Sequence, residues 1–450
     1  SSEKQARDVL LDAESPAAAA NSAAGRDRSG VSSLLFVAVT LICVSPIMFG
    51  YAISFTSSTQ SAMEGDDVDR VAPPDYLVEL NKFEESWYAS LLNVGCITGA
   101  FSGAFLSDRI GRRRTLVLTV LPHLIAWIGT GLAGGVASLI ILRLVLGWGV
   151  GVGSAVVPVY IGEVATTNLR GALGAANQLS VTFGIFLTNL LGAYVCTVDY
   201  KAETFTDWRI LSFVGAGIIL LLLGVALMPE SPSWLAKNHK SQEAEAALRK
   251  LRKGDISEEL QEMLSTSSES TPSTAAPAQH SASLSHYSRS LIVGIGMLTF
   301  QQLSGVNAVI MFAGDICKSA GLGDGKTAAM AIMGIQVVLT GVSCVLMERA
   351  GRRLLLLFGS MCMALGQLIL AYYFLAQDVD GLVAPSLLAL AALGIFILGF
   401  SLGLGPIPWL LLAEIFPTEV RSVACALGTA QNWLMSFVVT LSFLHVQEAI

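Results

Sequence analysis

The hexapeptide DRIGRR occupies residues 108–113, and it recurs as ERAGRR at residues 348–353. A second pattern, an acid followed seven positions later by an arginine, recurs in the same order at Glu163/Arg170 and Glu414/Arg421. One such match could arise by chance, but two matches in the same order with similar offsets indicate a duplicated chain. The repeats therefore predict two homologous halves.

Long apolar blocks surround both copies of the repeat. Hydrophobic residues make up 53% of the 450-residue chain and charged residues only 14%, whereas soluble domains carry about 25% charged residues. One block, 210–228, contains no ionisable side chain, and its length is what an α-helix needs to cross about 30 Å of hydrocarbon. The composition excludes a soluble protein and predicts an all-α polytopic membrane protein in a lipid bilayer.

Eleven apolar blocks are long enough to be spans. They lie near residues 33–55, 87–107, 115–134, 138–162, 172–195, 210–228, 290–313, 327–347, 354–376, 386–412 and 423–443. Two homologous halves around a midplane site are typical of transporters that rock one half against the other. We therefore expect two six-helix halves with inverted repeats, with the twelfth span missing from a truncated sequence.

Lys and Arg residues predict the orientation of the spans. Of the 27, 20 lie in the N-terminal tail and the loops on its side, 6 lie in the opposite loops, and Arg143 lies inside the fourth span. This asymmetry predicts a cytosolic N-terminus. The choice between the plasma membrane and an endosomal or lysosomal membrane stays open, because the dileucine at 10–11 is only a weak sorting signal.

The chain divides into four regions. Residues 1–32 are polar and rich in Ala and Ser, which is typical of a disordered tail, here cytosolic. The two halves, 33–228 and 290–450, are separated by 229–289. This interval contains strong helix formers followed by a Ser/Thr-rich segment, so we predict a cytosolic linker with short helices.

Several classes of function lack the residues they need. Seven cysteines without a CxxC pair and five scattered histidines predict no metal site. No nucleophile–base set indicates an enzyme or a cofactor, and no strongly basic domain indicates nucleic acid binding. The alternating glycines of 147–153 lie in an apolar block with no preceding strand, so they indicate close helix packing rather than nucleotide binding.

The repeated acids and arginines have two roles in this interpretation. The arginines hold the orientation of the protein in the membrane. Their pairing with acids at helix ends predicts a cytosolic gate, because charge-assisted bonds would close the inner face and must break to open it. The gate residues are Asp108, Arg112, Glu163 and Arg170 in the first half and Glu348, Arg352, Glu414 and Arg421 in the second.

Polar residues inside the spans are costly in lipid unless they face a cavity or another helix. The densest cluster is QQLSGVN at 301–307, and further amides and aromatic rings lie mid-span at Gln178, Gln336, Phe400, Trp409 and Asn432. Helix–helix hydrogen bonding remains an explanation for each amide alone. Several amides together with aromatic faces, however, suit a site for a small uncharged polyhydroxyl solute.

Two spans are expected to be broken. Gln302 and Asn307 are about 140° apart around an ideal helix, so Gly305 must help to unwind or bend the seventh span if both face one ligand. In the tenth span, the glycines and prolines of 403–408 break the helix before Trp409, which makes a suitable hinge.

The first span lacks an acid that could carry a proton. Residues 31–63 contain no Asp or Glu, and the middle of the span reads Phe49-Gly-Tyr-Ala52. A proton-coupled carrier needs an intramembrane acid to load and unload. The sequence therefore favours transport without proton coupling.

These residues resemble the sugar porter family of the major facilitator superfamily, and the chain is most like the class III facilitative glucose transporters. The matching stretches are DRIGRRR (108–114), PVYIGEVATTNLRG (158–171), PESP (229–232), FQQLSGVNAV (300–309), MERAGRR (347–353), GPIPWLLLAEIFP (405–417) and NWLMSF (432–437). The resemblance implies the twelve-span major facilitator fold, alternating access and a hexose substrate.

The resemblance also implies which residues bind the sugar: Gln178, Gln301, Gln302, Asn307, Gln336, Phe400, Trp409 and Asn432. Proton-coupled members of the family have an aspartate where this chain has Ala52, and the QLS run of 302–304 is associated with a preference for glucose. We therefore expect a facilitative uniporter of monosaccharides, with glucose as the expected substrate and no nucleotide or cofactor. A proton-coupled sugar symporter and a non-transporting sugar receptor are the alternatives.

Overall fold

The structure is a computed structural model. The residues it describes are 30–63, 78, 80–166, 168–195, 198–199, 204–205, 208–269, 287–321, 325–377, 385–416 and 418–449. The predicted tail up to residue 29, with its dileucine, and most of the Ser/Thr-rich segment, 270–286, lie outside the described residues.

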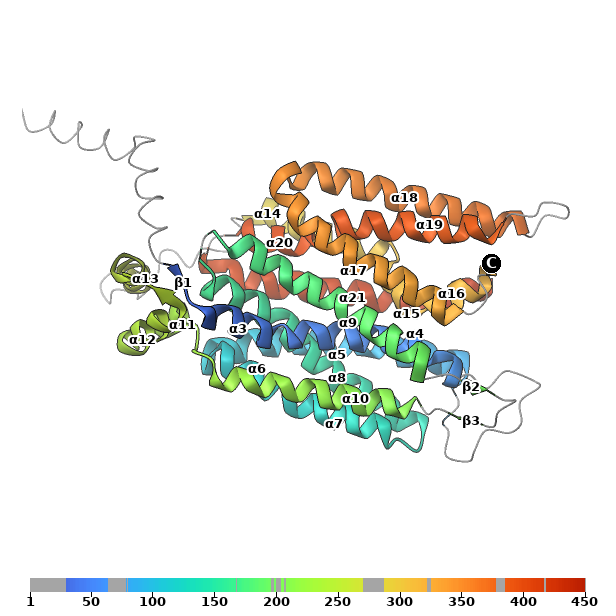
Figure 1. Cartoon of the computed structure of the whole chain (residues 1–450), viewed down its shortest axis with the longest axis horizontal. Helices are drawn as coiled ribbons and strands as arrows, with labels where there is room; N and C mark the ends of the chain where they lie inside the picture. The colour runs from blue at the N-terminus through green and yellow to red at the C-terminus, as the bar shows by residue number, and fades with distance from the viewer. Residues whose placement is uncertain are drawn as a thin grey trace, which may run out of the picture.

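The first half consists of long helices that run along the long axis of the molecule (Figure 1). Their bounds are α3 (Ser33–Ile42), α4 (Val44–Met63), α5 (Lys82–Ile110), α6 (Arg112–Leu118), α7 (Val120–Gly131), α8 (Val136–Val164), α9 (Arg170–Val195), α10 (Arg209–Leu220) and the 3-10 helix η1 (Leu221–Leu227). The capping of α5 is typical: the Asn81 side chain accepts from the Glu84 N–H, and the Glu84 carboxylate accepts from the Asn81 N–H.

The second half repeats this arrangement with more interruptions. Its elements are α14 (Ser288–Leu303), α15 (Val306–Met311), α16 (Ala313–Ser319), α17 (Gly325–Ala350), α18 (Arg352–Gln377), α19 (Ser386–Gly399), the π-helical segment η3 (Phe400–Leu404), α20 (Ile407–Glu414) and α21 (Thr418–Ala449). Both predicted breaks are confirmed, because Gly305 separates α14 from α15 and η3 separates α19 from α20.

The predicted spans correspond closely to these helices. Within the part of the chain that the structure describes, nine helical stretches are long and apolar enough to cross a membrane. The predicted spans 115–134 and 290–313 are each built from two consecutive helices, α6 with α7 and α14 with α15. All eleven predicted spans are therefore helical. Five of them are interrupted, because 33–55 contains the boundary of α3 and α4, 210–228 continues from α10 into η1, and 386–412 is broken at η3.

Small residues bring α5 and α8 into backbone contact. A Cβ atom added at Gly147 would lie 2.1 Å from the carbonyl oxygen of Leu92, and one added at Gly151 would lie 2.2 Å from that of Cys96. No other residue fits at these distances, so the predicted role of these glycines in close helix packing is confirmed. The contact fixes the position of α5 in the first half.

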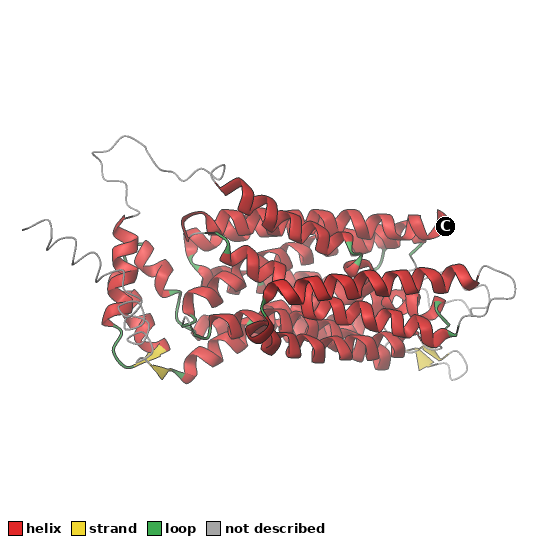
Figure 2. Ribbon diagram, turned by 90° about the horizontal axis from the view of Figure 1, so that it is seen from above, coloured by secondary structure: helices red, strands yellow, loops and turns green. Residues whose placement is uncertain are grey.

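A small helical unit lies at one end of the bundle, which we call the linker end (Figure 1). It contains α11 (Pro232–Lys237), α12 (Ser241–Leu251) and α13 (Ser257–Glu269). At this end β1 (Gly30–Val31) pairs antiparallel with β4 (Arg252–Lys253), a pairing that the sequence did not predict. The other two-stranded sheet, β2 (Val198–Asp199) with β3 (Thr204–Phe205), lies at the opposite end (Figure 2).

Arg252 fastens this unit to the first half. Its Nη1 donates to the carbonyl oxygen of Val164 at the end of α8, at 2.9 Å. Its Nε and Nη2 donate to the two carboxylate oxygens of Glu259, at 3.1 and 2.9 Å. The Arg252 side chain is buried. It supplies a cationic hydrogen-bond donor to the last turn of α8, where the carbonyl groups have no partner within the helix.

The two halves meet along paired helices. In the first half α5 packs along α21 of the second, and α9 packs along α17. At the opposite end the main-chain N–H of Gly314, in α16, donates to Ser57 Oγ of α4 at 3.2 Å. The boundary between the halves is thus lined by α4, α5, α9, α15, α17 and α21, and several of the polar residues below lie on these helices.

Candidate binding site between the two halves

The break at Gly305 brings two predicted site residues together. Gly305 has φ +78°, a left-handed conformation that glycine adopts without strain. As a result Asn307 lies beside Gln302, and its Nδ2 donates to Gln302 Oε1 at 2.8 Å. Both side chains are buried, so the unwound segment creates one polar surface from positions that a continuous helix would separate.

This polar surface continues across the boundary between the halves. Asn307 Nδ2 also donates to Ser436 Oγ of α21 at 2.6 Å, and Ser436 Oγ donates to Asn93 Oδ1 of α5 at 3.0 Å. We call Gln302, Asn307, Ser436 and Asn93 the amide relay. It joins four helices, α5 from the first half and α14, α15 and α21 from the second. Asn93 and Ser436 were absent from the predicted site.

Gln301 does not join the amide relay, and its side chain contacts the break in the tenth span and Asn432 instead. Its Nε2 donates to the carbonyl oxygens of Leu404 and Gly405, the second at 3.1 Å, where η3 interrupts the helix. Its Oε1 accepts from Asn432 Nδ2 at 2.9 Å. In this conformation Gln301 and Asn432 therefore support the break in the tenth span, because they supply partners to carbonyl groups that a regular helix would satisfy.

Gln336 is the predicted site residue with the most open hydrogen-bonding capacity. It is 0% exposed, and neither Oε1 nor Nε2 has a partner among the described residues. On the same helix, Thr340 Oγ1 is also buried without a described partner. A buried polar group that lacks a hydrogen bond costs about 1–3 kcal/mol. Such groups indicate that a ligand or water completes the site.

The remaining predicted site residues have other described contacts. Phe400 is buried in η3 and packs against Gly405. Trp409 is half-buried and packs against the apolar cluster around Leu298. Gln178 is half-buried on α9, the helix that packs along α17. Among the described residues no hydrogen bond connects Gln178 or Trp409 to the amide relay.

Trp433 adds an aromatic contact between the halves. Its ring lies 5.1 Å from that of Phe49 in α4, centroid to centroid. Its Nε1 donates to Ser154 Oγ of α8 at 3.4 Å. Trp433 therefore spans the boundary beside Asn432, and it places an aromatic face at the edge of the polar surface.

Arg143 is a buried cation in α8 that the predicted site did not include. Its Nη1 donates to the carbonyl oxygen of Ala52 at 3.0 Å, and its Nη2 donates to Thr56 Oγ1. The guanidinium also lies 4.4 Å from the centroid of the Tyr88 ring. Within the described part of the chain no carboxylate forms an ion pair with it. The sequence did contain a signal for this residue, because Arg143 is the single Lys or Arg inside a predicted span.

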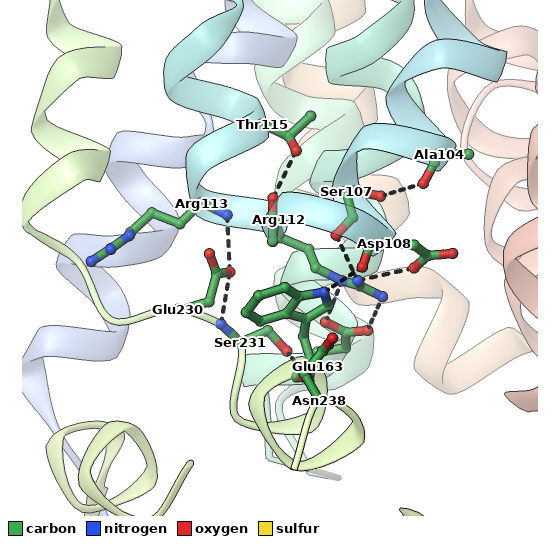
Figure 3. A network of polar contacts seen from close by, with 12 residues as sticks. Ala104, Ser107, Asp108, Arg112, Arg113, Thr115, Glu163, Glu230, Ser231 and Asn238 are labelled. Atoms are coloured by element: carbon green, nitrogen blue, oxygen red, sulfur yellow. Dashed lines mark hydrogen bonds and ion pairs between the residues drawn. The ribbon is translucent and has the colours of Figure 1, made fainter. Parts of the chain in front are cut away.

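A charged network occupies the linker end of the first half (Figure 3). Arg112 Nε and Nη2 donate to the two carboxylate oxygens of Glu163 at 3.0 and 2.9 Å. Arg112 Nη1 donates to Asp108 Oδ1 at 3.0 Å and to the Ser107 carbonyl oxygen at 2.9 Å. The sequence predicted that Asp108, Arg112 and Glu163 come together, and the structure brings them together.

The network extends further than predicted. Glu230 Oε1 accepts from the main-chain N–H groups of Arg113 and Ser231, both at 3.0 Å. Trp234 Nε1 donates to the Asp108 carbonyl oxygen at 2.9 Å. These contacts connect the start of the linker to the α5–α6 corner. Glu230 belongs to the PESP stretch, which was the available signal for it.

The second predicted gate cluster is only partly described. Arg352 begins α18 and is exposed. The remaining predicted gate side chains lie outside the described residues: Arg170, Glu348, Glu414 and Arg421. The gate contacts given above are those of the first half.

Comparison with known proteins identifies the family. The family model "Sugar (and other) transporter" matches residues 37–450. The chain is 36% identical to "Sugar transporter ERD6-like 6" of Arabidopsis thaliana, over 90% of this chain and 80% of that one. It is 34% identical to "Solute carrier family 2, facilitated glucose transporter member 8" of Mus musculus, over 92% of this chain and 86% of that one.

A solved structure supports the same conclusion. The proton:xylose symporter XylE of the major facilitator superfamily, bound to 6-bromo-6-deoxy-D-glucose, superposes with a TM-score of 0.77 at 25% identity, covering 93% of this chain and 90% of that one. The predicted all-α major facilitator fold is confirmed, and so is the prediction that the chain is not an enzyme. The chain belongs to the sugar transporter family of the major facilitator superfamily, and it is a multi-pass membrane protein that transports sugar.

Proposed function

We propose that this protein is a facilitative uniporter of monosaccharides, with glucose as its main substrate, and that it works by alternating access. The observation that supports this most directly is the amide relay together with Gln336. The relay contains side chains from both halves, and Gln336 has an amide whose two polar atoms lack described partners. A substrate bound there would contact both halves at once.

The chemistry of this surface favours a neutral sugar. Every member of the relay is an amide or a hydroxyl, and each of these groups both donates and accepts hydrogen bonds, as a sugar hydroxyl does. A charged substrate would require a desolvated counter-charge. The family relationship to a protein named a facilitated glucose transporter supports glucose as the substrate.

Arg143 and Ala52 support uniport. The buried guanidinium is held by a carbonyl oxygen, a hydroxyl and an aromatic ring, all groups that do not titrate in the working pH range of a transporter. A proton-coupled mechanism is the second candidate, because the solved structural relative is titled a proton:xylose symporter. It would need an acid that loads and unloads a proton, and position 52 supplies none.

We propose that the linker end is cytosolic and that the Arg112 network belongs to the inner gate. The excess of Lys and Arg at that end supports the orientation. All described partners of Arg112 belong to the first half, so the network would set the shape of that half's inner end. The host membrane would be the plasma membrane or an endosomal or lysosomal one.

The test is counterflow in proteoliposomes with a panel of sugars, with and without a pH gradient. We expect saturable glucose counterflow that an imposed pH gradient and an uncoupler leave unchanged. Proton entry driven by sugar would establish symport instead. Sugar binding to the purified protein without any counterflow would establish the receptor alternative.

A further inference from the structure

Asn93 is the one relay member that the first half contributes. It lies near the middle of α5, and it is 0% exposed. Its Oδ1 accepts the hydroxyl hydrogen of Ser436 at 3.0 Å, whereas its Nδ2 is buried without a partner among the described residues. One end of this amide is therefore anchored, and the other end is an open donor.

The direction of the hydrogen bonds fixes which end is open. Asn307 Nδ2 can only donate, and it donates to both Gln302 Oε1 and Ser436 Oγ. Ser436 Oγ thus acts as acceptor toward Asn307, and its single hydrogen is left for Asn93 Oδ1. The amide of Asn93 is oriented by this chain, so its two N–H hydrogens are the unsatisfied groups.

The backbone that presents Asn93 is rigid. The two neighbouring turns of α5 contact α8 through glycine, since Gly147 meets Leu92 and Gly151 meets Cys96. A side chain on such a fixed helix cannot easily move to another partner. The open donor would cost about 1–3 kcal/mol if nothing bound it, which indicates that a ligand satisfies it during the transport cycle.

We propose that Asn93 is a specificity-determining residue, whose Nδ2 donates a hydrogen bond to one hydroxyl group of the bound sugar. This inference rests on the proposed function, because it assigns a further contact to the same site. The amides of the second half then contact other hydroxyl groups, and Asn93 adds a contact from the first half. The sugar thereby links the two halves that must move together.

The experiment measures binding of glucose and its 2-, 3-, 4- and 6-deoxy analogues to the purified protein. In the wild type, the analogue that lacks the contacted hydroxyl binds about 3- to 10-fold more weakly than glucose, the range expected for one hydrogen bond. Asn93→Leu keeps the branched shape of the side chain, with a larger volume, and removes both the donor and the acceptor. It weakens glucose binding by the same factor and leaves binding of that one analogue unchanged.

Ser90→Ala is the matched control. Ser90 is also buried on α5, one turn before Asn93, and among the described residues its hydroxyl donates to the Ser86 carbonyl oxygen of its own helix alone. We expect its analogue profile to equal that of the wild type. Equal weakening of all analogues in Asn93→Leu, or unchanged glucose binding, would overturn the assignment, because a purely structural role produces no selectivity for one hydroxyl.

A second variant covers the case in which Asn93→Leu does not fold. Ser436→Ala keeps the Asn93 donor but removes the Ser436 hydroxyl that orients the Asn93 amide. We expect this variant to discriminate less strongly between glucose and that analogue. Discrimination equal to that of the wild type would contradict the proposal. Counterflow by the wild type distinguishes failure of the proposed function from failure of the Asn93 assignment. If the wild type moves no sugar, the proposed function fails, whereas normal wild-type counterflow with an unaltered analogue profile in the variants removes only the role of Asn93.

Discussion

Arg112 and Glu163 form a two-point contact, with Nε and Nη2 of the arginine at 3.0 and 2.9 Å from the two carboxylate oxygens. This geometry joins the start of α6 to the end of α8, two elements that are far apart in the sequence but adjacent at the linker end. Arg112 is buried and also donates to Asp108 at the end of α5. The arginine therefore connects α5, α6 and α8 at this end of the first half.

We expect Glu163→Gln to slow glucose counterflow while the protein stays folded and binds sugar. The substitution keeps the size of the side chain but removes one charge, which weakens this contact by about 1–2 kcal/mol after allowance for its partial exposure. Counterflow rate and binding affinity are measured on the same preparation. Glu243→Gln is the control, because Glu243 pairs with Lys240 at an exposed position. Equal rates for both variants would show that the Arg112 network has no part in the gate.

Substitutions of the neighbouring residues Gln301 and Gln302 are expected to have different effects on stability and on sugar binding. Gln301→Leu leaves two carbonyl groups of the helix break and the amide of Asn432 without their partner, so we expect a loss of stability of about 1–3 kcal/mol. Gln302→Ala should instead weaken sugar binding and uptake, with a smaller loss of stability, because Asn307 Nδ2 keeps Ser436 Oγ as an acceptor. Thermal unfolding of the purified proteins and sugar binding together separate these effects. An equal loss of stability in both variants would contradict the distinction.

Much of this architecture depends on local signals, and those parts could be predicted. The spans follow from runs of apolar residues, and the break at Gly305 follows from the angle between Gln302 and Asn307. The contact of Asp108 and Arg112 with Glu163 follows from a motif that occurs twice. Each of these inferences needs only the composition or spacing of a short segment.

The parts that could not be predicted depend on how each helix is rotated about its axis. Consecutive residues of a helix point about 100° apart, so neighbours such as Gln301 and Gln302 reach different partners. Only packing decides that Asn93 on α5 meets Ser436 on α21. The pairing of β1 with β4 joins two-residue strands, which are too short to carry an alternating pattern.

Gly305→Ala tests the left-handed break in the seventh span. A Cβ atom at this position would meet nothing within 4 Å, so the cost comes from backbone conformation alone, about 1–2 kcal/mol. We expect a lower melting temperature together with weaker sugar binding, because the break positions Asn307 beside Gln302. Gly296→Ala is the control, since Gly296 lies inside α14 and also has open space around it. An equal response of the two variants would mean that the conformation of Gly305 is unimportant.

Ala52→Asp tests the explanation for uniport. The Ala52 carbonyl oxygen already accepts from Arg143 at 3.0 Å, so a carboxylate at position 52 would lie within reach of a buried cation and could exchange a proton during the cycle. We expect sugar uptake by this variant to depend on pH and to respond to an imposed proton gradient, whereas uptake by the wild type does not. Ala52→Asn has the same size without the charge, and it should behave like the wild type. If the wild type already loses uptake on addition of an uncoupler, proton coupling occurs elsewhere in the molecule, and the neutral surroundings of Arg143 do not explain the mechanism.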